Sequence, residues 1–323
     1  MIVFINWLRA LAAILITNSH YDGIYPIDIL ANGGLIGDVL FFAVSGFCLY
    51  NIRLRFDKWY LKRIARIYPA VIIITAVYLS VGLYTMESIS LKNVIKWFVY
   101  PTNYHFVASI MILYIPFYIC MKIQYIKKRI PHAMAVTLII WLTVYIFIYD
   151  KSTYHIDNVR EPMIRFLYFE SMLMGALFRA KYEMNKYSNR ITNWILMICA
   201  FMLYFATKIA FSRIPSISVY QIINQFTILL LLYFIFRSFA GIDIVLERAP
   251  AWISKVVTYL SKTTLEIYLI QYGILVPIKS IGWIFPMNWI VMTAVILALS
   301  AILHICTLGA NKLIDKGMSK LVK

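Results

Sequence analysis

The sequence predicts an all-α polytopic membrane protein, a bundle of about ten transmembrane helices with both termini in the cytoplasm. Composition is the first reason: the 323 residues are 62% hydrophobic and 14% charged, with a mean hydropathy of +0.78. A soluble domain is about 45–50% apolar and about 25% charged. The second reason is charge placement, because the basic residues lie between apolar runs. The net charge of +17 therefore reflects membrane topology, and no nucleic-acid partner is expected.

Ten apolar runs come close to the roughly 20 residues that a helix needs to cross the hydrocarbon core. The first run has no basic segment before it and no small-residue cleavage site, so we expect a retained helix rather than a signal peptide. Pro116 interrupts the fourth run, and Gly273 and Pro277 interrupt the ninth. In chain order the runs are 2–19, 34–50, 68–84, 103–121, 133–149, 162–178, 193–211, 219–236, 263–278 and 287–308.

The loops between these runs alternate in charge. One set, together with the tail after residue 308, holds 22 lysines and arginines, whereas the other set, counted with Lys208 at a helix end, holds seven. Cytoplasmic loops are enriched in lysine and arginine, so the basic set and both termini are predicted to be cytoplasmic. The basic loops are 51–67, 122–132, 179–192 and 237–262.

The longest of these loops, 237–262, is predicted to contain an amphipathic helix on the inner leaflet. Its apolar residues recur at helical spacing beside three basic residues. They are Trp252, Ile253, Val256, Val257 and Leu260, beside Arg248, Lys255 and Lys262.

The four cysteines, Cys48, Cys120, Cys199 and Cys306, stand singly in apolar surroundings. No pair has the spacing of metal ligands, so we expect buried small hydrophobic side chains, with neither a disulfide nor a metal site. No fused soluble domain and no internal repeat is evident. Residues 1–323 are therefore predicted to form a single integral-membrane domain.

Arg63 and Arg66 are the first candidate functional residues. Side chains at i and i+3 lie on nearly the same face of a helix, and guanidinium groups bind phosphate in a bidentate manner. The pair therefore suits an anionic, phosphorylated ligand at the membrane surface. A basic loop that only fixes topology explains the same residues equally well.

His20 and Arg9 are the polar candidates of the first run. A histidine can take a proton from a hydroxyl group at neutral pH, although an interfacial histidine without a catalytic role fits the same position. Arg9 lies about two turns inside the run, where a charge should face the bundle interior or a wet cavity. Snorkelling to the cytoplasmic surface is the alternative.

The second run carries Asp38 and Ser45 among glycines. Gly33, Gly37 and Gly46 allow close approach of helices, which most often serves packing alone. Asp38 either orients His20 or its substrate, or is solvated at the outer end of the helix.

Two further carboxylates lie in apolar runs. Glu170 is a candidate because intramembrane carboxylates are often functional, and an ion pair with Arg165 is the alternative. Glu266 follows Lys262 by four residues, which predicts a local ion pair.

Three motifs near the N-terminus occur in order and resemble the integral-membrane acyltransferase family 3. That family shows LR…H, FFxxSGF and RxxRIxP, and this chain has Leu8-Arg9 with His20, then FFAVSGF at 41–47 and KRIARIYP at 62–69. Later stretches resemble the family's WF…LY…P, F-x-x-G and S…IYLxH segments. They are 104–116, 169–175 and 261–271.

The chain departs from the family pattern at two positions. His105 stands where the family often has tryptophan, and Gln271 stands where it often has histidine. The second departure leaves more of the expected catalysis to His20.

The resemblance implies an enzyme of the bacterial inner membrane that takes an acyl group, usually acetyl, from cytoplasmic acetyl-CoA. The acceptor would be a hydroxyl group of a cell-surface or lipid-linked glycan, such as an O-antigen or capsule intermediate. Arg63 and Arg66 would bind the CoA phosphates and His20 would be the catalytic histidine. Arg9 would contact the cofactor and, with Ser45, line its passage.

The predicted topology fits a donor site at the arginines and a catalytic site at His20, because the arginine pair lies on the cytoplasmic side and His20 lies toward the other face. Arg9 and His20 are about 16 Å apart along an α-helix, a span that a pantetheine arm can cover. We therefore expect a membrane O-acyltransferase whose other partners are membrane lipids. A transporter or flippase for a lipid-linked glycan or small solute is the alternative, since Pro- and Gly-broken spans and buried charges suit that function too.

Overall fold

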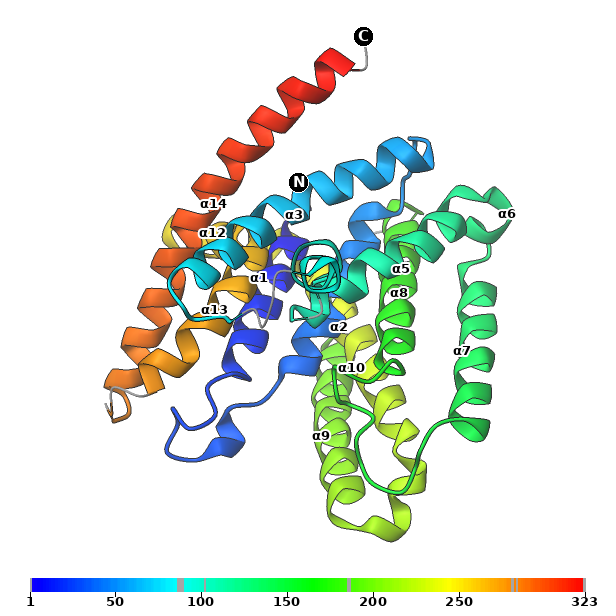
Figure 1. Ribbon diagram of the computed structural model, residues 1–323. Coiled ribbons are helices and arrows are strands. Elements are labelled where there is room, and N and C mark those ends of the chain that lie inside the picture. The colour runs from blue at the N-terminus through cyan, green and yellow to red at the C-terminus, as the bar shows by residue number, and fades with distance from the viewer. Residues whose placement is uncertain are drawn as a thin grey trace. The chain divides into compact units, whose positions relative to one another are not determined.

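The structure is a computed structural model that describes residues 2–85, 90–101, 103–184, 187–279, 282 and 284–321. Across these residues the chain forms helices and no strand (Figure 1). The all-α prediction is therefore confirmed.

Each of the ten predicted runs corresponds to one long helix. Neither Pro116 nor Gly273 breaks its helix. The helices are α1 (Val3–Asn18), α2 (Gly34–Leu49), α3 (Phe56–Ser80), α5 (His105–Lys122), α7 (Ile130–Phe147), α8 (Ile164–Met184), α9 (Ile191–Arg213), α10 (Ile222–Gly241), α13 (Thr264–Lys279) and α14 (Met287–Leu321).

Shorter helices connect them. The predicted amphipathic helix is present as α12, where Trp252 is exposed and Val257 is buried. The short elements are η1 (Asp28–Leu30), α4 (Leu91–Val94), the π-helix η2 (Ile95–Val99), α6 (Gln124–Lys127), η3 (Pro215–Tyr220), α11 (Asp243–Glu247) and α12 (Ala251–Lys262).

Seven helical segments of the described chain are long and apolar enough to cross a membrane, and α1 is a shorter apolar helix. Two boundaries differ from the sequence prediction. α3 begins at Phe56, so the basic stretch at 62–69 is helical rather than part of a loop. No glycine or proline lies between Phe56 and Ile67 to interrupt a helix. α14 continues past 308 through the basic tail to Leu321. The chain is a multi-pass membrane protein.

The chain divides into two compact units, and neither is a continuous stretch of sequence. Unit 1 comprises Met1–Arg9, Leu35–Arg53 and Ile112–Lys255. Unit 2 comprises Ala10–Gly34, Leu54–Met111 and Val256–Lys323.

In unit 1, α9 and α10 form an antiparallel hairpin closed by η3, and α8 packs against α7 and α10 (Figure 1). The helices α2 and α8 approach each other closely at two glycines. A Cβ atom added at Gly46 would lie 2.0 Å from the carbonyl oxygen of Met172, and one at Gly175 would lie 1.8 Å from that of Ala43. The packing role predicted for Gly46 is thus confirmed, and Gly175 is its counterpart on α8.

In unit 2, α13 packs against α14 and α3, and α14 also contacts α3. The ring of Tyr78 on α3 lies where a Cβ of Gly273 would be, and its hydroxyl donates to the carbonyl of Ile270 at 2.6 Å. Gly273 therefore allows close packing of α3 against α13, and it does not break α13.

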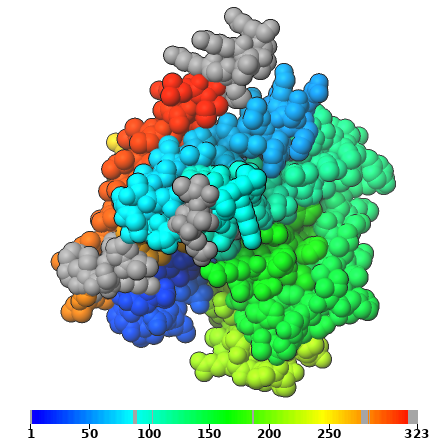
Figure 2. Space-filling model, viewed as in Figure 1, coloured from blue at the N-terminus to red at the C-terminus, as the bar shows by residue number. Residues whose placement is uncertain are grey.

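Large apolar side chains remain exposed, as expected where lipid replaces water. Phe147 of α7 is 80% exposed and Leu91 of α4 is 78% exposed; α4 and η2 lie at the surface, coloured cyan in Figure 2. The expectation of buried cysteines is wrong, because none of the four is buried. All four thiols are free, Cys120 is half-buried, and Cys48, Cys199 and Cys306 are exposed.

Candidate functional site

The predicted phosphate-binding pair lies in the first half of α3, in unit 2. The guanidinium carbon of Arg63 is 5.9 Å from the centroid of the Trp59 ring. Trp59 is buried and Arg63 is half-buried, whereas Arg66 is exposed. The indole thus fixes Arg63 by a cation–π contact, and Arg66 extends from nearly the same helix face.

His20 lies in the turn that follows α1, also in unit 2. Its ring meets the ring of Tyr272 edge-on at 5.2 Å, and Tyr272 in turn meets Tyr104 at 5.9 Å. The hydroxyl of Tyr272 donates to that of Tyr268 at 3.2 Å, which also accepts from the backbone N–H of Phe106 at 3.2 Å. His20, Tyr104, Tyr268 and Tyr272 are called the histidine–tyrosine cluster below.

The arginine pair and the cluster are linked through α3. Thr75 donates a hydrogen bond to the hydroxyl of Tyr104 at 3.4 Å. It lies twelve residues after Arg63 on the same helix, which corresponds to about 18 Å along the axis. Unit 2 therefore holds the two arginine side chains on the first half of α3 and, further along that helix, an imidazole that contacts a tyrosine ring.

Glu266 does not form the local pair predicted with Lys262. Its carboxylate is 2.8 Å from Nδ1 of His304 on α14. Glu266 is buried while Lys262 is exposed. The interhelical partner prevails because a buried carboxylate requires a hydrogen-bond partner, and His304 is half-buried whereas Lys262 is exposed.

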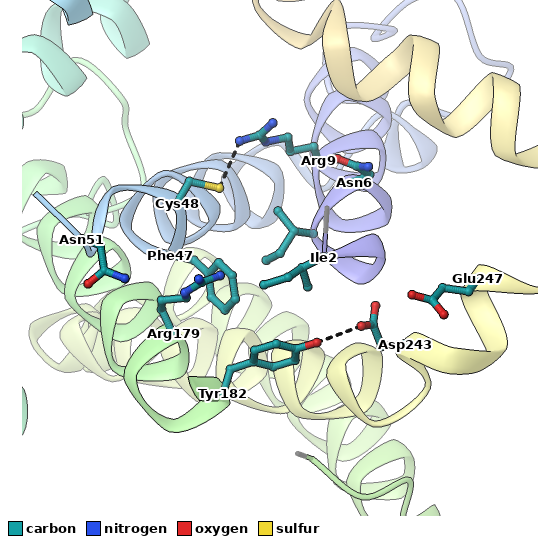
Figure 3. A pocket seen from close by; sticks show the side chains of 11 residues that line it. Ile2, Asn6, Arg9, Phe47, Cys48, Asn51, Arg179, Tyr182, Asp243 and Glu247 are labelled. Atoms are coloured by element: carbon teal, nitrogen blue, oxygen red, sulfur yellow. Dashed lines mark hydrogen bonds between the residues drawn. The ribbon is translucent and has the colours of Figure 1, made fainter. Parts of the chain in front are cut away.

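Arg9 lines a pocket of about 610 Å³ within unit 1 (Figure 3). Its Nη2 atom is 3.2 Å from the Sγ atom of Cys48 on α2. The complete lining is Ile2, Ile5, Asn6, Arg9, Phe47, Cys48, Asn51, Arg179, Tyr182, Asp243 and Glu247. Arg9 therefore lines a cavity, as expected for a charge within a membrane span.

The walls of this pocket carry both signs of charge. The guanidinium of Arg179 lies over the Phe47 ring at 5.3 Å, and its Nε donates to Glu183. Opposite, Asp243 accepts hydrogen bonds from the N–H of Phe4 at 2.7 Å and from the hydroxyl of Tyr182 at 3.0 Å. The close crossing of α2 and α8 brings Phe47 and Cys48 against the helix that carries Arg179 and Tyr182.

Asp38 is buried at 8% exposure and accepts a hydrogen bond from the hydroxyl of Tyr168 at 2.9 Å. The Tyr168 ring stacks on that of Phe42 at 4.2 Å. The alternative of a solvated carboxylate is therefore wrong. Its observed partner is a tyrosine of α8.

Ser45 and Glu170 lie outside the pocket lining. Ser45 is half-buried on α2, three residues before Cys48. Glu170 is buried on α8 and accepts a hydrogen bond from Thr137 of α7. The observed hydrogen bond of Glu170 thus joins two helices of unit 1.

An apolar groove of about 180 Å³ lies in unit 2. Asn18 and Tyr21, which flank His20 in the sequence, contribute to it. The hydroxyl of Tyr21 is 2.8 Å from Oγ1 of Thr293, which lines the groove from α14. The remaining lining is almost wholly apolar and includes Ile14, Ile267, Ile296 and Leu297.

Sequence reasoning missed the three tyrosines of the cluster and Arg179. Tyr104 and Tyr268 lie inside stretches that resemble family motifs, so a signal was present. Tyr272 and Arg179 stand outside those motifs, and only the folded chain brings them to His20 and to the Arg9 pocket.

The model of one protein family, described as an acyltransferase domain, matches residues 2–306 of the chain. Comparisons with curated proteins and with solved structures gave no match.

Proposed function

This chain belongs to acyltransferase family 3 and is a membrane acyltransferase, and from that premise we propose that it moves an acetyl group from cytoplasmic acetyl-CoA to a glycan hydroxyl. The glycan is a cell-surface or lipid-linked saccharide at the bacterial inner membrane. The observation that carries the proposal is the arrangement in unit 2, where Arg63 lies about 18 Å along the axis of α3 from Thr75, which donates a hydrogen bond to Tyr104 of the histidine–tyrosine cluster.

Arg63 and Arg66 bind the phosphate groups of the donor. A CoA molecule carries several phosphate charges, and guanidinium groups are the side chains best suited to them. The flexible pantetheine arm then spans the distance to the cluster. Arg9 is assigned to the donor as well, because its pocket of about 610 Å³ has the size of a small-molecule site.

His20 acts as the general base. Its imidazole takes the proton of the acceptor hydroxyl while the hydroxyl oxygen attacks the thioester carbonyl carbon. The new C–O bond forms and the C–S bond breaks, so CoA leaves as a thiolate. The imidazolium returns the proton to that thiolate. The edge-on ring of Tyr272 at 5.2 Å keeps the imidazole in one orientation.

The apolar groove supports an acceptor that is carried on a lipid. A hydrocarbon chain in the groove would place its head group near Asn18 and Tyr21, the residues that flank His20. This contact would increase the local concentration of the acceptor hydroxyl at the imidazole.

Sealed membrane vesicles supplied with labelled acetyl-CoA and a candidate glycan test the proposal. We expect label in the glycan with the wild type, a loss of at least about a hundredfold with His20→Ala, and a large loss with Arg63→Ala. His132→Ala and Arg129→Ala are matched controls, because both side chains are exposed. Equal labelling in all five proteins would refute the assignments. Solute uptake without labelling would establish a transporter instead.

A further inference from the structure

Gln271 is buried without a hydrogen-bond partner. Its side chain is 0% exposed, and neither Oε1 nor Nε2 has a partner among the residues that the structure describes. An amide that is removed from water and left unpaired destabilises the folded protein. Such a group can bind a ligand that brings its own polar groups, and its position in the fold decides whether a ligand can meet it.

The position of Gln271 relates it to the proposed reaction. On α13 it follows Ile270, whose carbonyl accepts from Tyr78, and it precedes Tyr272, whose ring contacts His20. It lies three residues after Tyr268, on nearly the same face of the helix. All of these residues belong to unit 2. The unpaired amide thus lies at the level of the histidine–tyrosine cluster.

The chemistry of the side chain limits its ligand. A glutamine does not titrate, so it cannot replace a histidine in proton transfer. It offers one acceptor and two donor hydrogens, without a charge to balance an anion. A neutral ligand with its own amide N–H and C=O groups matches this set.

We propose that Gln271 binds the pantetheine arm of the acyl donor. Oε1 accepts from an amide N–H of the arm and Nε2 donates to an amide carbonyl. The arm has two amides between the CoA phosphates and the thioester, and both need partners in an apolar interior. The inference rests on the proposed function, since it requires an acyl-CoA donor. It assigns to Gln271 the placement of the thioester beside His20.

Gln271→Met is the decisive variant, because it keeps the length of the side chain and removes both hydrogen-bonding groups. Gln225→Met is its matched control. Gln225 lies on α10 in unit 1, is also 0% exposed, and also lacks a partner for both amide atoms among the described residues. It is distant in sequence from every residue assigned to the reaction.

The readout compares two donors on the purified full-length protein. For Gln271→Met we expect KM for acetyl-CoA to rise about tenfold. KM for S-acetyl-2-mercaptoethanol, an acetyl thioester without amides, should stay within about twofold. Gln271→His, which keeps a donor and an acceptor, should restore part of the acetyl-CoA affinity. Gln225→Met should behave as wild type with both donors.

Binding without turnover gives a second measurement. The affinity of Gln271→Met for CoA should fall about tenfold, while that for 3′-phosphoadenosine 5′-phosphate, which lacks the arm, should be unchanged. Its unfolding temperature without ligand should equal or exceed that of the wild type, because an unpaired buried amide has been removed.

Unchanged KM and CoA affinity in a folded Gln271→Met protein would overturn the inference. So would equal losses with both donors, which would indicate a structural role. Failure of the wild type to bind or use acetyl-CoA would overturn the proposed function and this inference together, and the wild-type measurement identifies that case.

Discussion

Cys48 is a natural reporter of what enters the Arg9 pocket. Its thiol is exposed and hydrogen-bonded to Arg9. In a protein whose only cysteine is Cys48, we expect saturating acetyl-CoA to slow alkylation by a maleimide about tenfold. Arg9→Ala should abolish this protection, because a lost hydrogen bond to a charged group weakens binding by about 1.5–3 kcal/mol.

A protein whose only cysteine is Cys199 provides the control, since that thiol is also exposed in unit 1 but lies outside the pocket. Equal alkylation of Cys48 with and without the donor would remove Arg9 from the donor site.

The partner of Glu266 leads to a prediction about stability. Glu266→Ala leaves Nδ1 of His304 without its acceptor, and we expect a loss of about 1–3 kcal/mol in the free energy of unfolding. Lys262→Ala, which changes an exposed side chain, should stay within about 0.5 kcal/mol.

A double-mutant cycle on Glu266 and His304 isolates the pair, measured by thermal unfolding in detergent. A coupling energy near zero would contradict the interhelical pair. A large effect of Lys262→Ala would restore the local pair that the sequence predicts.

At the scale of elements, the crossing of α2 and α8 depends on two glycines. Gly46→Ala and Gly175→Ala each place a methyl group within about 2 Å of a backbone oxygen on the other helix, where no side chain can move aside. We expect each to destabilise unit 1 by at least about 1–3 kcal/mol. The loss should appear as a lower unfolding temperature.

Gly309→Ala on α14 is the control, because nothing lies within 4 Å of its added Cβ. Alanine has the higher helix propensity by about 1 kcal/mol, so this variant should be at least as stable as wild type. Equal stability of all three variants would show that the crossing is looser than described.

The same crossing shows where sequence reasoning succeeds and where it ends. Apolar runs and the placement of basic residues predict ten long helices, since both properties are local in the chain. The start of α3 at Phe56 was not predicted, because the apolar run begins only at residue 68 and the first turns of the helix are basic. The close contacts of Gly46 and Gly175 with the other helix, and the contact of Glu266 with His304, join segments that are far apart in sequence. Such contacts leave no local pattern.

The candidate site divides in the same way. Arg63, Arg66 and His20 are singled out by residue type and motif, and all three lie in unit 2. Tyr272 and Gln271 differ because their significance depends on a ring contact and on an absent hydrogen bond. Neither property exists before the helices pack.

At the scale of the whole molecule, each unit is assembled from three separate stretches of sequence. A truncation at any position inside the chain therefore leaves at least one unit incomplete. The membrane topology also concerns the whole molecule, because it is predicted from the charges of all the loops. The topology decides whether cytoplasmic acetyl-CoA can reach the arginine pair.

Two single-cysteine proteins test that topology after the four natural cysteines are replaced by serine. Ile27→Cys lies in a loop predicted to be outside, and Lys58→Cys lies near the start of α3 on the predicted inner side; both positions are exposed. In intact cells a membrane-impermeant maleimide should label the first and spare the second, and permeabilisation should make both reactive.

Labelling of Lys58→Cys in intact cells would place Arg63 and Arg66 on the outer face. Acetyl-CoA made in the cytoplasm could then not be bound there, and the assignment of the donor phosphates to these arginines would fail even if the helices are as described.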